Sequence, residues 1–467
     1  MDRQRRTLTA LAITCALVMT LISATASASR ETPNARSAPP APTAYLEPVV
    51  VAYFSSGNIY SATDPYYPKD IPADKITHIN YAFAKPESNG TCVLGDPWAD
   101  YQRPFPAAQS VDGVADISGQ ALMGNFNQLR KLKLAHPGLK LFISIGGWTF
   151  SDWFSNAAVS ASARQTFVQS CIDMFIRSDG VAAGVFSGID IDWEYPVCCG
   201  EAGNINRPDD RHNATLLFKE FRAQLDALGA ETGRQYLLTA AIPPGNLRSA
   251  GSFELARLSR ILDWINLMGY DFHGQWEDTT NFDSPFRLDP ADPTAPGLRP
   301  YWNVKGTVDF FRSEGVAATK LVLGIPFYGK QYIGVATSGH GLYQPFDDSA
   351  LGDGDEAWQR DTQPGYHALV DIAGIVSGPT LSGPTPVGRR GFTRYWNSAA
   401  GEPFLWSSAD ERNGVATSVF ISYEDPRSVN ERVKYIERQG LRGAMIWEIS
   451  LDTVDHDLIK VVTKLLP

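Results

Sequence analysis

Three acidic residues alternate with apolar ones in one short run of the sequence. The run spans residues 188–196 and reads GIDIDWEYP, so Asp190, Asp192 and Glu194 are spaced two apart. Side chains alternate between the two faces of a β-strand, and the three carboxyls therefore project to one face. Like charges buried side by side raise one another's pKa, so at least one carboxyl keeps its proton near neutral pH and can act as a general acid. The alternative, an edge strand with a solvated acidic face, fits poorly with the flanking Ile, Trp and Pro residues.

The elements that must position this row alternate between strand and helix patterns along the chain. Short runs rich in β-branched and aromatic residues predict eight strands, at 49–54, 76–83, 139–147, 188–195, 237–243, 264–271, 321–328 and 443–450. Helical periodicity predicts helices at 121–136, 162–178, 213–228, 305–314 and 427–439. Eight strands with intervening helices predict an α/β fold, a closed (β/α)8 TIM barrel. In such a barrel the acidic row runs up the interior, and Glu194 arrives at the carboxyl-terminal mouth, where catalytic groups lie.

Two intervals between the predicted strands are longer than one helix requires. About 55 residues separate the second and third strands, and more than 110 separate the seventh and eighth. Strand-like runs at 393–396 and 417–423, with hairpin-like loops such as 377–388, occupy the second interval. We therefore expect one catalytic unit over 47–467, interrupted by a small α+β insertion over 330–421 between strands 7 and 8.

The first 46 residues carry targeting and linker signals. Three arginines precede an apolar run over 8–22, and Ala-Ser-Ala at 26–28 forms a small-residue cleavage pattern, which together predict a secretory signal peptide over 1–28. A membrane anchor is the alternative, but the apolar run is shorter than the roughly 20 residues that span a bilayer. Residues 29–46, rich in Pro and Ala, are predicted to form an extended linker, and we expect a secreted, extracellular protein.

The overall composition narrows the choice of partner. The chain has 467 residues, is 43% hydrophobic and carries a formal net charge of −10. This balance argues against a nucleic acid or an anionic membrane surface and suits a neutral substrate. There is no P-loop or strand-linked G-x-G-x-x-G, and His78 and His273 lack metal-ligand spacing, so we expect no cofactor and no metal.

Four cysteines follow the predicted signal peptide: Cys92, Cys171, Cys198 and Cys199. They are too few for the disulfide scaffold of a small secreted domain, and their pairing in an oxidising medium stays open. For the adjacent Cys198 and Cys199, just past the acidic strand, a rigidifying disulfide is favoured over a nucleophilic role.

The acidic run resembles the D-G-x-D-x-D-x-E signature of the family 18 glycoside hydrolases, the chitinases and their relatives, with Ser187 where the first Asp is usual. Residues 144–148, SIGGW, resemble the family's S-x-G-G motif on the third strand, and residues 268–271, MGYD, resemble its M-x-Y-D motif on the sixth. The remaining strands are matched by VAYF at 51–54, HINYAF at 78–83, GIPFYG at 324–329 and AMIWE at 444–448. The resemblance covers roughly residues 48–460, and the long interval after the seventh strand resembles the family branch with an α+β insertion.

The resemblance implies a catalytic role for four residues. The Glu that matches Glu194 protonates the glycosidic oxygen, and the Asp that matches Asp192 orients the substrate's own N-acetyl group, whose carbonyl oxygen attacks the anomeric carbon. The Asp that matches Asp190 shares a proton with Asp192, which lets Asp192 turn toward Glu194 when substrate binds. The match to Tyr270 donates its hydroxyl to the N-acetyl oxygen and stabilises the oxazolinium intermediate.

Further matches imply contacts to the acidic row or to the sugar. Tyr53 and Ser144 are expected to hydrogen-bond Asp190, and Asp271 is expected to help bind and distort the sugar. Sugar rings present apolar C–H faces that pack on aromatic rings, so a saccharide site requires aromatic residues near strand ends. The substrate-binding candidates are Tyr53, Phe83, Ser144, Trp148, Met268, Asp271, Trp276, Tyr328 and Trp447. For Met268 packing is the favoured alternative, and for Phe83 and a further aromatic candidate, Trp396, core packing is equally open.

Two positions depart from the family pattern. Ser187 replaces an Asp that contributes to the buried network low in the barrel, so we expect a shifted pKa of Asp190 and an altered pH profile. Lys330 stands where the family often has Arg. The matching positions also imply non-proline cis peptides at Ala82–Phe83, Glu194–Tyr195 and Trp447–Glu448.

The resemblance thus implies a secreted, monomeric chitinase that acts on chitin and chitooligosaccharides with retention of configuration. One alternative is an endo-β-N-acetylglucosaminidase acting on N-glycans, which shares the acidic motif but generally lacks the insertion. The other is a non-catalytic chitin-binding lectin on the same barrel, a class that has typically lost the acid that Glu194 supplies here.

Overall fold

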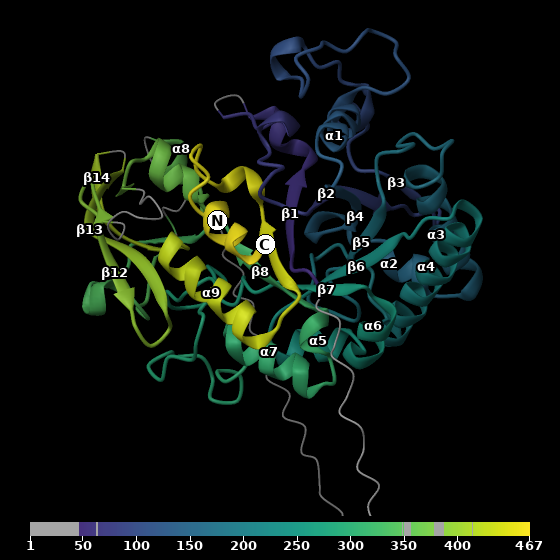
Figure 1. Cartoon of the computed structure of the whole chain (residues 1–467). Helices are drawn as coiled ribbons and strands as arrows, with labels where there is room; N and C mark the ends of the chain where they lie inside the picture. The colour runs from purple at the N-terminus through teal and green to yellow at the C-terminus, as the bar shows by residue number, and fades with distance from the viewer. Residues whose placement is uncertain (1–45, 62–63, 348, 350–355, 378–386, 413) are drawn as a thin grey trace, which may run out of the picture. The chain divides into compact units, whose positions relative to one another are not determined.

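An eight-stranded parallel barrel contains all of the predicted strands (Figure 1). The strands are β1 (Val49–Ser55), β2 (His78–Pro86), β4 (Lys140–Gly146), β5 (Gly188–Asp192), β6 (Leu237–Ile242), β7 (Trp264–Leu267), β8 (Leu321–Pro326) and β15 (Gly443–Trp447). They pair in chain order, and β1 pairs with both β2 and β15, so the sheet closes on itself. The predicted α/β class and (β/α)8 architecture are confirmed.

The computed structural model describes residues 46–467, apart from 62–63, 348, 350–355, 378–386 and 413. Residues Leu46–Pro467 form one compact unit. The predicted signal peptide, and the predicted linker up to residue 45, lie outside the described residues. Among the helices that are described, none is both long and apolar enough to cross a bilayer.

Strand β5 has two chemically different faces. Ile189 and Ile191 are fully buried in the main hydrophobic core. Asp190 and Asp192 are also buried, and Asp190 bonds to side chains of β1 and β7 across the barrel. The alternation of the strand therefore places the acidic face toward the barrel interior, as its pattern predicts.

Helices connect the strands on the outside of the barrel (Figure 1). The five predicted helices are present as α1 (Gly124–Ala135), α3 (Ala161–Phe175), α4 (Asp210–Thr232), α7 (Val304–Ser313) and α9 (Pro426–Gln439). Shorter helices are α2 (Phe154–Ala158), α5 (Asn246–Ser252), α6 (Leu255–Ile261) and α10 (Ile459–Val462).

Helix α9 shows how the sequence sets such an element. Its N-terminal amides donate to the side chain of Asp425, and the helix ends at Gly440, whose φ of 63° suits a residue without Cβ. Val429, Val433 and Ile436 are buried at the spacing of one helical face. This face anchors α9 against the barrel ahead of β15.

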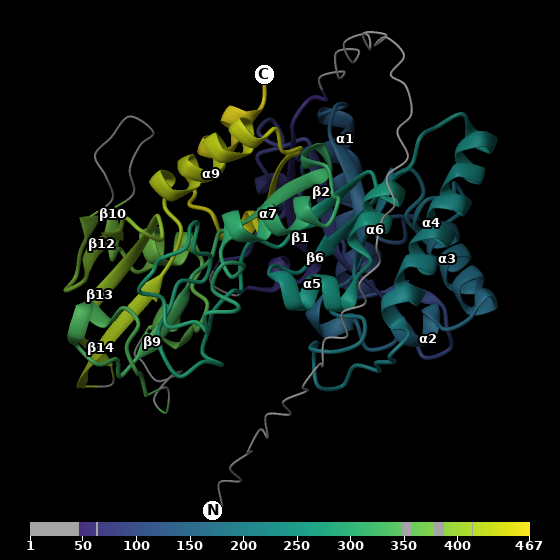
Figure 2. The same cartoon turned by 90° about the horizontal axis from the view of Figure 1, so that it is seen from below.

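A small α+β insertion lies between β8 and β15. Its antiparallel sheet has the order β12 (Thr393–Asn397), β13 (Glu402–Arg412), β14 (Val415–Ser422) and β9 (Lys330–Ile333), with the short helix α8 (Ala357–Arg360) nearby in sequence. Figure 2 shows this sheet on the other side of the barrel from α3 and α4. A separate small core, which includes Phe282, Tyr332, Phe404 and Phe420, stabilises it. Of the predicted loop 377–388, residues 378–386 lie outside the described part.

The cysteines are arranged in two pairs. Cys198 and Cys199 form a disulfide with each other in the segment after β5. Cys92, on strand β3 (Cys92–Leu94), and Cys171, on α3, are buried free thiols. Burial and the hydrogen-bonding contact with Cys92 raise the pKa of Cys171 well above its usual value, so the Cys171 thiol is unreactive as a nucleophile.

Candidate active site

Asp190 is the most tightly bound carboxylate of the acidic row. Its Oδ2 atom accepts hydrogen bonds from Tyr53 Oη at 2.6 Å and Ser144 Oγ at 2.8 Å. Its Oδ1 atom accepts hydrogen bonds from Thr239 Oγ1 at 2.5 Å and Asn266 Nδ2 at 3.0 Å. Burial raises the pKa of Asp190, and the four hydrogen bonds oppose that rise. Tyr53 and Ser144 occupy the predicted positions, whereas the sequence reasoning missed Thr239 and Asn266.

Asp192, two residues further along β5, has a different environment. Its Oδ1 atom has no hydrogen-bond partner among the described residues, and its other carboxyl contact is with Glu194. Burial raises the pKa of Asp192 well above its usual value, and the charges of Glu194 and Asp190 raise it further. Burial also raises the pKa of Glu194 to about 7, and the charge of Asp271 adds to the rise. The Asp192–Glu194 pair therefore keeps a proton near neutral pH, as a general acid requires.

The contact between Asp192 and Glu194 bears on the proton sharing that the family resemblance implies. Among the described residues, no hydrogen bond joins Asp190 to Asp192, and all the bonds of Asp190 go to neutral side chains. The structure thus has Asp192 in contact with Glu194. Sharing of a proton between Asp190 and Asp192 stays a prediction.

The backbone of Glu194 is held on both sides. Its amide N–H donates to Ser151 Oγ at 2.8 Å, and its carbonyl oxygen accepts a hydrogen bond from Asn204 Nδ2 at 2.7 Å. Gly200 packs so closely on this carbonyl that an added Cβ would lie 2.0 Å from the oxygen. The Glu194–Tyr195 peptide is cis, as are Ala82–Phe83 and Trp447–Glu448, which confirms the three predicted cis bonds. Ser151 and Asn204 match no motif and were missed.

Tyr270 follows β7 at the same end of the barrel. Its hydroxyl has one described acceptor, Met445 Sδ at 3.7 Å, and thioether sulfur accepts only weakly. Burial, and then the charges of Asp192, Asp271 and Glu194, raise the pKa of Tyr270 well above its usual value. The side chain is therefore a neutral hydroxyl with a proton available for donation beside the acidic pair.

Asp271, the next residue, adopts a φ of 54°, which is uncommon for a residue with a Cβ. Its amide donates to Asp283 Oδ1 at 3.1 Å, and Lys330 Nζ lies 2.5 Å from its Oδ1 atom. The side chain of Asp271 is 43% exposed, while that of Lys330 is 1% exposed. An ion pair with one buried and one accessible partner therefore lies next to Tyr270.

Aromatic side chains gather around Tyr53 at the carboxyl ends of the strands. The ring of Trp447 lies 5.2 Å from that of Tyr53 and stacks on Phe83 at 5.8 Å. Phe83 and Trp447 are both partly exposed, which leaves ring surface for a ligand. Trp148 and Trp276 are half-exposed. Exposed ring surface of this kind is what packing against the C–H faces of a sugar would require.

Other predicted aromatic or apolar positions are less accessible. Tyr328 is buried with its ring 6.0 Å from that of Tyr270. Met268 is buried in the main core, which is the packing alternative. Trp396 has the guanidinium of Arg427 3.7 Å from its ring centre, so a cation covers the ring that a sugar would need.

Ser187 does not belong to the described hydrogen-bond network of Asp190, so the expectation that it shifts the pKa of Asp190 gains no support and stays a prediction. Its amide donates to Leu141 O, and Asp190 is the third residue after it, so by strand alternation the two side chains face opposite sides of the sheet. Ser187 instead lines a cavity of about 730 Å³ together with Lys133 and Arg177.

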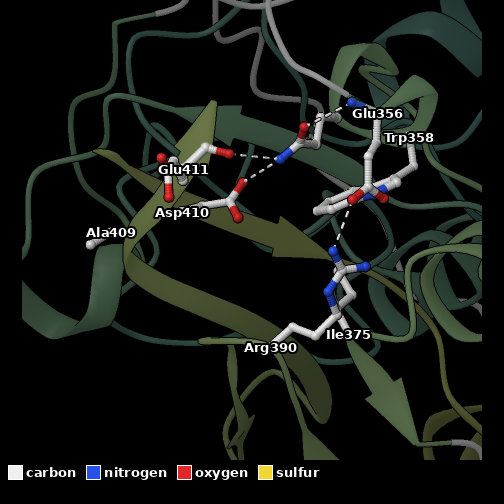
Figure 3. A pocket seen from close by; sticks show the side chains of 8 residues that line it. Glu356, Trp358, Ile375, Arg390, Ala409, Asp410 and Glu411 are labelled. Atoms are coloured by element: carbon white, nitrogen blue, oxygen red, sulfur yellow. Dashed lines mark hydrogen bonds and ion pairs between the residues drawn. The ribbon is translucent and has the colours of Figure 1, made fainter. Parts of the chain in front are cut away.

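A second cavity, of about 270 Å³, lies within the insertion (Figure 3). Figure 3 shows Arg390 reaching Glu356, and the two form an ion pair at 2.8 Å. Neither cavity is lined by a residue predicted for catalysis or substrate binding. The candidate active site is therefore defined by the acidic row and its partners.

The histidines of interest have structural partners. His78 is buried with Nδ1 2.7 Å from Thr77 Oγ1, and His273 is buried with Nδ1 2.9 Å from Glu277. Within the described ranges, no group of three or more His, Cys, Asp or Glu side chains could hold a metal ion.

Comparison with known proteins gives one family and a consistent set of relatives. The model of the glycosyl hydrolases of family 18 matches residues 49–452. Chitinase A1 of Niallia circulans is 37% identical over 436 residues, which cover 86% of this chain and 56% of the relative. Chitinase C of Streptomyces lividans is 34% identical over 423 residues, which cover 88% of this chain and 58% of the relative. The chain thus spans a little over half the length of these curated relatives.

Solved structures give the same result. The catalytic domain of psychrophilic chitinase B from Arthrobacter TAD20 superposes with a TM-score of 0.76 at 30% identity, over 90% of this chain and 95% of that one. Chitinase ChiA74 from Bacillus thuringiensis superposes with a TM-score of 0.73 at 33% identity, over 90% and 70% of the two chains.

Proposed function

This chain belongs to the glycosyl hydrolases of family 18, and we propose that it is a chitinase that cleaves β-1,4-linked N-acetylglucosamine polymers with retention of configuration. The observation that carries the proposal is the contrast along β5. Asp190 accepts four hydrogen bonds, while Asp192 contacts Glu194 and has one oxygen without a hydrogen-bond partner in the described part of the chain. The names of the similar proteins, chitinases in each case reported above, support the same substrate class.

In the first proposed step, Glu194 gives its proton to the glycosidic oxygen as the bond from that oxygen to the anomeric carbon breaks. The carbonyl oxygen of the substrate's acetamide forms a new bond to the anomeric carbon from the opposite face, which produces an oxazolinium ion. The unpartnered Oδ1 of Asp192 accepts the acetamide N–H and aligns the group for attack. Tyr270 donates its hydroxyl hydrogen to the acetamide oxygen, a stronger acceptor than Met445 sulfur.

In the second proposed step, the carboxylate of Glu194 takes a proton from a water molecule. The water oxygen bonds to the anomeric carbon as the bond to the acetamide oxygen breaks. Two inversions at one carbon give net retention, and Glu194 is protonated again for the next cycle. Because the substrate supplies the nucleophile, no second carboxylate is needed on the opposite face of the sugar.

The proposal includes an extracellular monomer. The pattern of residues 1–28 supports export with cleavage after Ala28. Mass spectrometry of the protein recovered from the culture medium should give a chain that begins at Ser29, and size-exclusion chromatography with light scattering should give one chain per particle. Retention in the cell with an intact leader would contradict the secretion claim.

Substrate class is tested by offering the purified protein chitohexaose and, separately, a high-mannose N-glycopeptide. A chitinase releases shorter N-acetylglucosamine oligomers from chitohexaose and leaves the glycopeptide intact. Release of the glycan instead would identify an endo-β-N-acetylglucosaminidase. Binding of chitohexaose without product would identify a lectin, and both outcomes would overturn the proposal.

A further inference from the structure

Lys330 is a buried cation at the junction of the insertion with the barrel. It opens strand β9 and its side chain is 1% exposed. Its Nζ atom lies 2.5 Å from Asp271 Oδ1, 3.8 Å from Asp283 Oδ1 and 2.9 Å from Gln363 Oε1. A buried ammonium requires such compensation, since removal from water strongly disfavours an unpaired charge.

Two aromatic rings enclose the same ammonium. Lys330 Nζ lies 5.3 Å from the ring centre of Trp276 and 5.1 Å from that of Tyr328. Cations are attracted to aromatic faces at this range. The two ring contacts and the hydrogen bond to Gln363 position Nζ without help from Asp271. The positioned ammonium then attracts the carboxylate of Asp271.

Asp271 is held at its backbone as well as at its side chain. Its amide donates to Asp283 Oδ1, and the amide of Phe272 donates to Asp283 O at 3.0 Å. The amide of Asp283 donates in turn to Ser422 Oγ at 2.9 Å. Ser422 is the register partner of Lys330 in the sheet formed by β14 and β9. One end of the insertion sheet therefore secures both the backbone and the carboxylate of Asp271.

Asp271 also acts on the catalytic acid. Its charge is one of the influences that raise the pKa of Glu194. Lys330 carries the opposite charge and contacts the Asp271 carboxylate directly, so it offsets part of that influence. The insertion is linked to Glu194 through this pair, and none of the described contacts of Lys330 is with Glu194 or Asp192.

We propose that Lys330 is a positioning residue for the catalytic centre: it acts through Asp271, holding that carboxylate against the insertion and balancing its charge beside Glu194. The inference rests on the proposed function for its kinetic consequence, but its electrostatic consequence for Glu194 does not depend on any substrate. Lys330 would therefore influence the protonation of Glu194 without contacting the sugar.

Several charged and phenolic groups surround Glu194 and Lys330. The charged groups facing Glu194 are Asp192, Asp271 and Arg248, and the phenols facing it are Tyr195 and Tyr270. The charged groups facing Lys330 are Asp271 and Asp283, with Glu424 and Arg432 beyond Asp283. Burial raises the pKa of Tyr195 and of Tyr270 well above the usual value, so both stay neutral across the working range.

The test compares Lys330→Met with Lys330→Arg, and uses Lys434→Met, a half-exposed lysine on α9, as the matched control. Glu194 is titrated by ¹³C NMR of labelled glutamate carboxyls, assigned with Glu194→Gln, which requires no substrate. In Lys330→Met the uncompensated charge of Asp271 should move the titration of Glu194 upward by about half a pH unit or more. Lys330→Arg and Lys434→Met should leave it within about 0.2 unit.

A second background shows whether the effect passes through Asp271. In an Asp271→Asn protein, Lys330→Met should cause less than half of the shift that it causes in the wild type. An equal shift in both backgrounds, or no shift in either, would overturn the proposal. Lys330→Gln, which keeps a donor for Gln363, replaces the Met variant if that protein does not fold. If neither neutral variant folds while Lys330→Arg does, Lys330 is purely structural and the proposal is again overturned.

Kinetics on chitotetraose separate this inference from the proposed function. In Lys330→Met, the basic limb of the kcat/KM profile should move in the same direction as the NMR titration, and kcat should fall about tenfold or more with a smaller change in KM. A wild-type protein that titrates as expected but does not hydrolyse chitotetraose would contradict the proposed function alone. If the wild type hydrolyses chitotetraose but the basic limb of the kcat/KM profile does not move in Lys330→Met, the inference alone is contradicted.

Discussion

Asp190 and Asp192 lie two residues apart on one strand, yet Asp190 accepts four side-chain hydrogen bonds while one oxygen of Asp192 has no partner among the residues that the structure describes. The first carboxylate is fixed by neighbours on β1, β4, β6 and β7, whereas the second is free to engage Glu194 and an incoming ligand. This division explains how three acidic groups share one buried row: hydrogen bonds stabilise the charge of Asp190, and a retained proton limits the charge of the other two.

Thr239 supplies one of the four hydrogen bonds to Asp190, at 2.5 Å. Thr239→Val keeps the shape of the side chain and removes the donor, so the buried carboxylate loses a charge-assisted hydrogen bond. We expect the free energy of unfolding to fall by about 1.5–3 kcal/mol, measured by urea denaturation at pH 7. Thr393→Val, at an exposed position of β12, is the control and should change it by less than about 0.5 kcal/mol. Equal effects of the two variants would contradict the role given to Thr239.

The raised pKa of Glu194 predicts a specific pH dependence of stability. Because the folded-state pKa of about 7 exceeds the ordinary value of 4.5, the native state binds more protons than the unfolded chain between these pH values. The stabilisation from this proton is complete below about pH 4.5 and is lost as the pH rises through 7. Relative to the wild type, Glu194→Gln should therefore gain about 3 kcal/mol of unfolding free energy between pH 4.5 and 8. The measurement is urea denaturation of both proteins at these two pH values. If the difference in unfolding free energy between Glu194→Gln and the wild type were the same at both, the raised pKa of Glu194 would be refuted.

Ser187 faces away from Asp190, so restoring the usual acid should not alter catalysis. The Ser187→Asp protein should show the same pH profile of kcat/KM on chitotetraose as the wild type, with both falling above about pH 7 as Glu194 loses its proton. Its new carboxylate would lie beside Lys133 and Arg177 rather than inside the barrel. A displacement of either limb by more than about 0.3 unit would show that the outward placement of Ser187 is wrong.

Arg432 is fully buried between two carboxylates at the base of the insertion. Its Nη2 atom lies 2.8 Å from Glu402 Oε1 and 2.6 Å from Glu424 Oε1. Burial raises the pKa of Glu402 well above its usual value and that of Glu424 to about 7, and the guanidinium opposes both shifts. Arg432→Met leaves these groups without a cation, and calorimetry or urea denaturation should show a loss of about 3–5 kcal/mol.

Two companion variants complete that experiment. Arg438→Met, on the exposed side of the same helix, should change stability by less than about 0.5 kcal/mol. The triple variant Arg432→Met/Glu402→Gln/Glu424→Gln should recover part of the loss, because no buried charge is then left unpaired. An Arg432→Met protein as stable as the wild type would mean that the ion-pair cluster does not support the junction.

The sequence was sufficient for the barrel and for the acidic face of β5, because both depend on local periodicity. Strand alternation alone places Asp190, Asp192 and Glu194 together, and the order of the strand motifs places Tyr53, Ser144 and Tyr270 around them. The same rule, applied with the correct parity, also predicts that Ser187 faces outward.

The remaining features depend on contacts between distant segments. Thr239 and Asn266 are single polar residues in otherwise apolar strands. Such a residue indicates a side-chain hydrogen bond inside the barrel, but the sequence does not identify the partner. The ion pair of Lys330 with Asp271 depends on how the insertion docks on the barrel, and no local pattern encodes that docking. The pairing of Cys198 with Cys199 likewise needed the structure, since four cysteines allow three complete pairings.

The most direct measurement of the central claim follows chitotetraose hydrolysis by ¹H NMR for the wild type, Glu194→Gln and the exposed control Glu437→Gln. The account predicts that the wild type and the control release the β-anomer first, with slower mutarotation to the α-anomer. It predicts that Glu194→Gln, which keeps the shape but not the acid, loses about a hundredfold or more of kcat. Undiminished turnover by Glu194→Gln, or the α-anomer as the first product of the wild type, would contradict it.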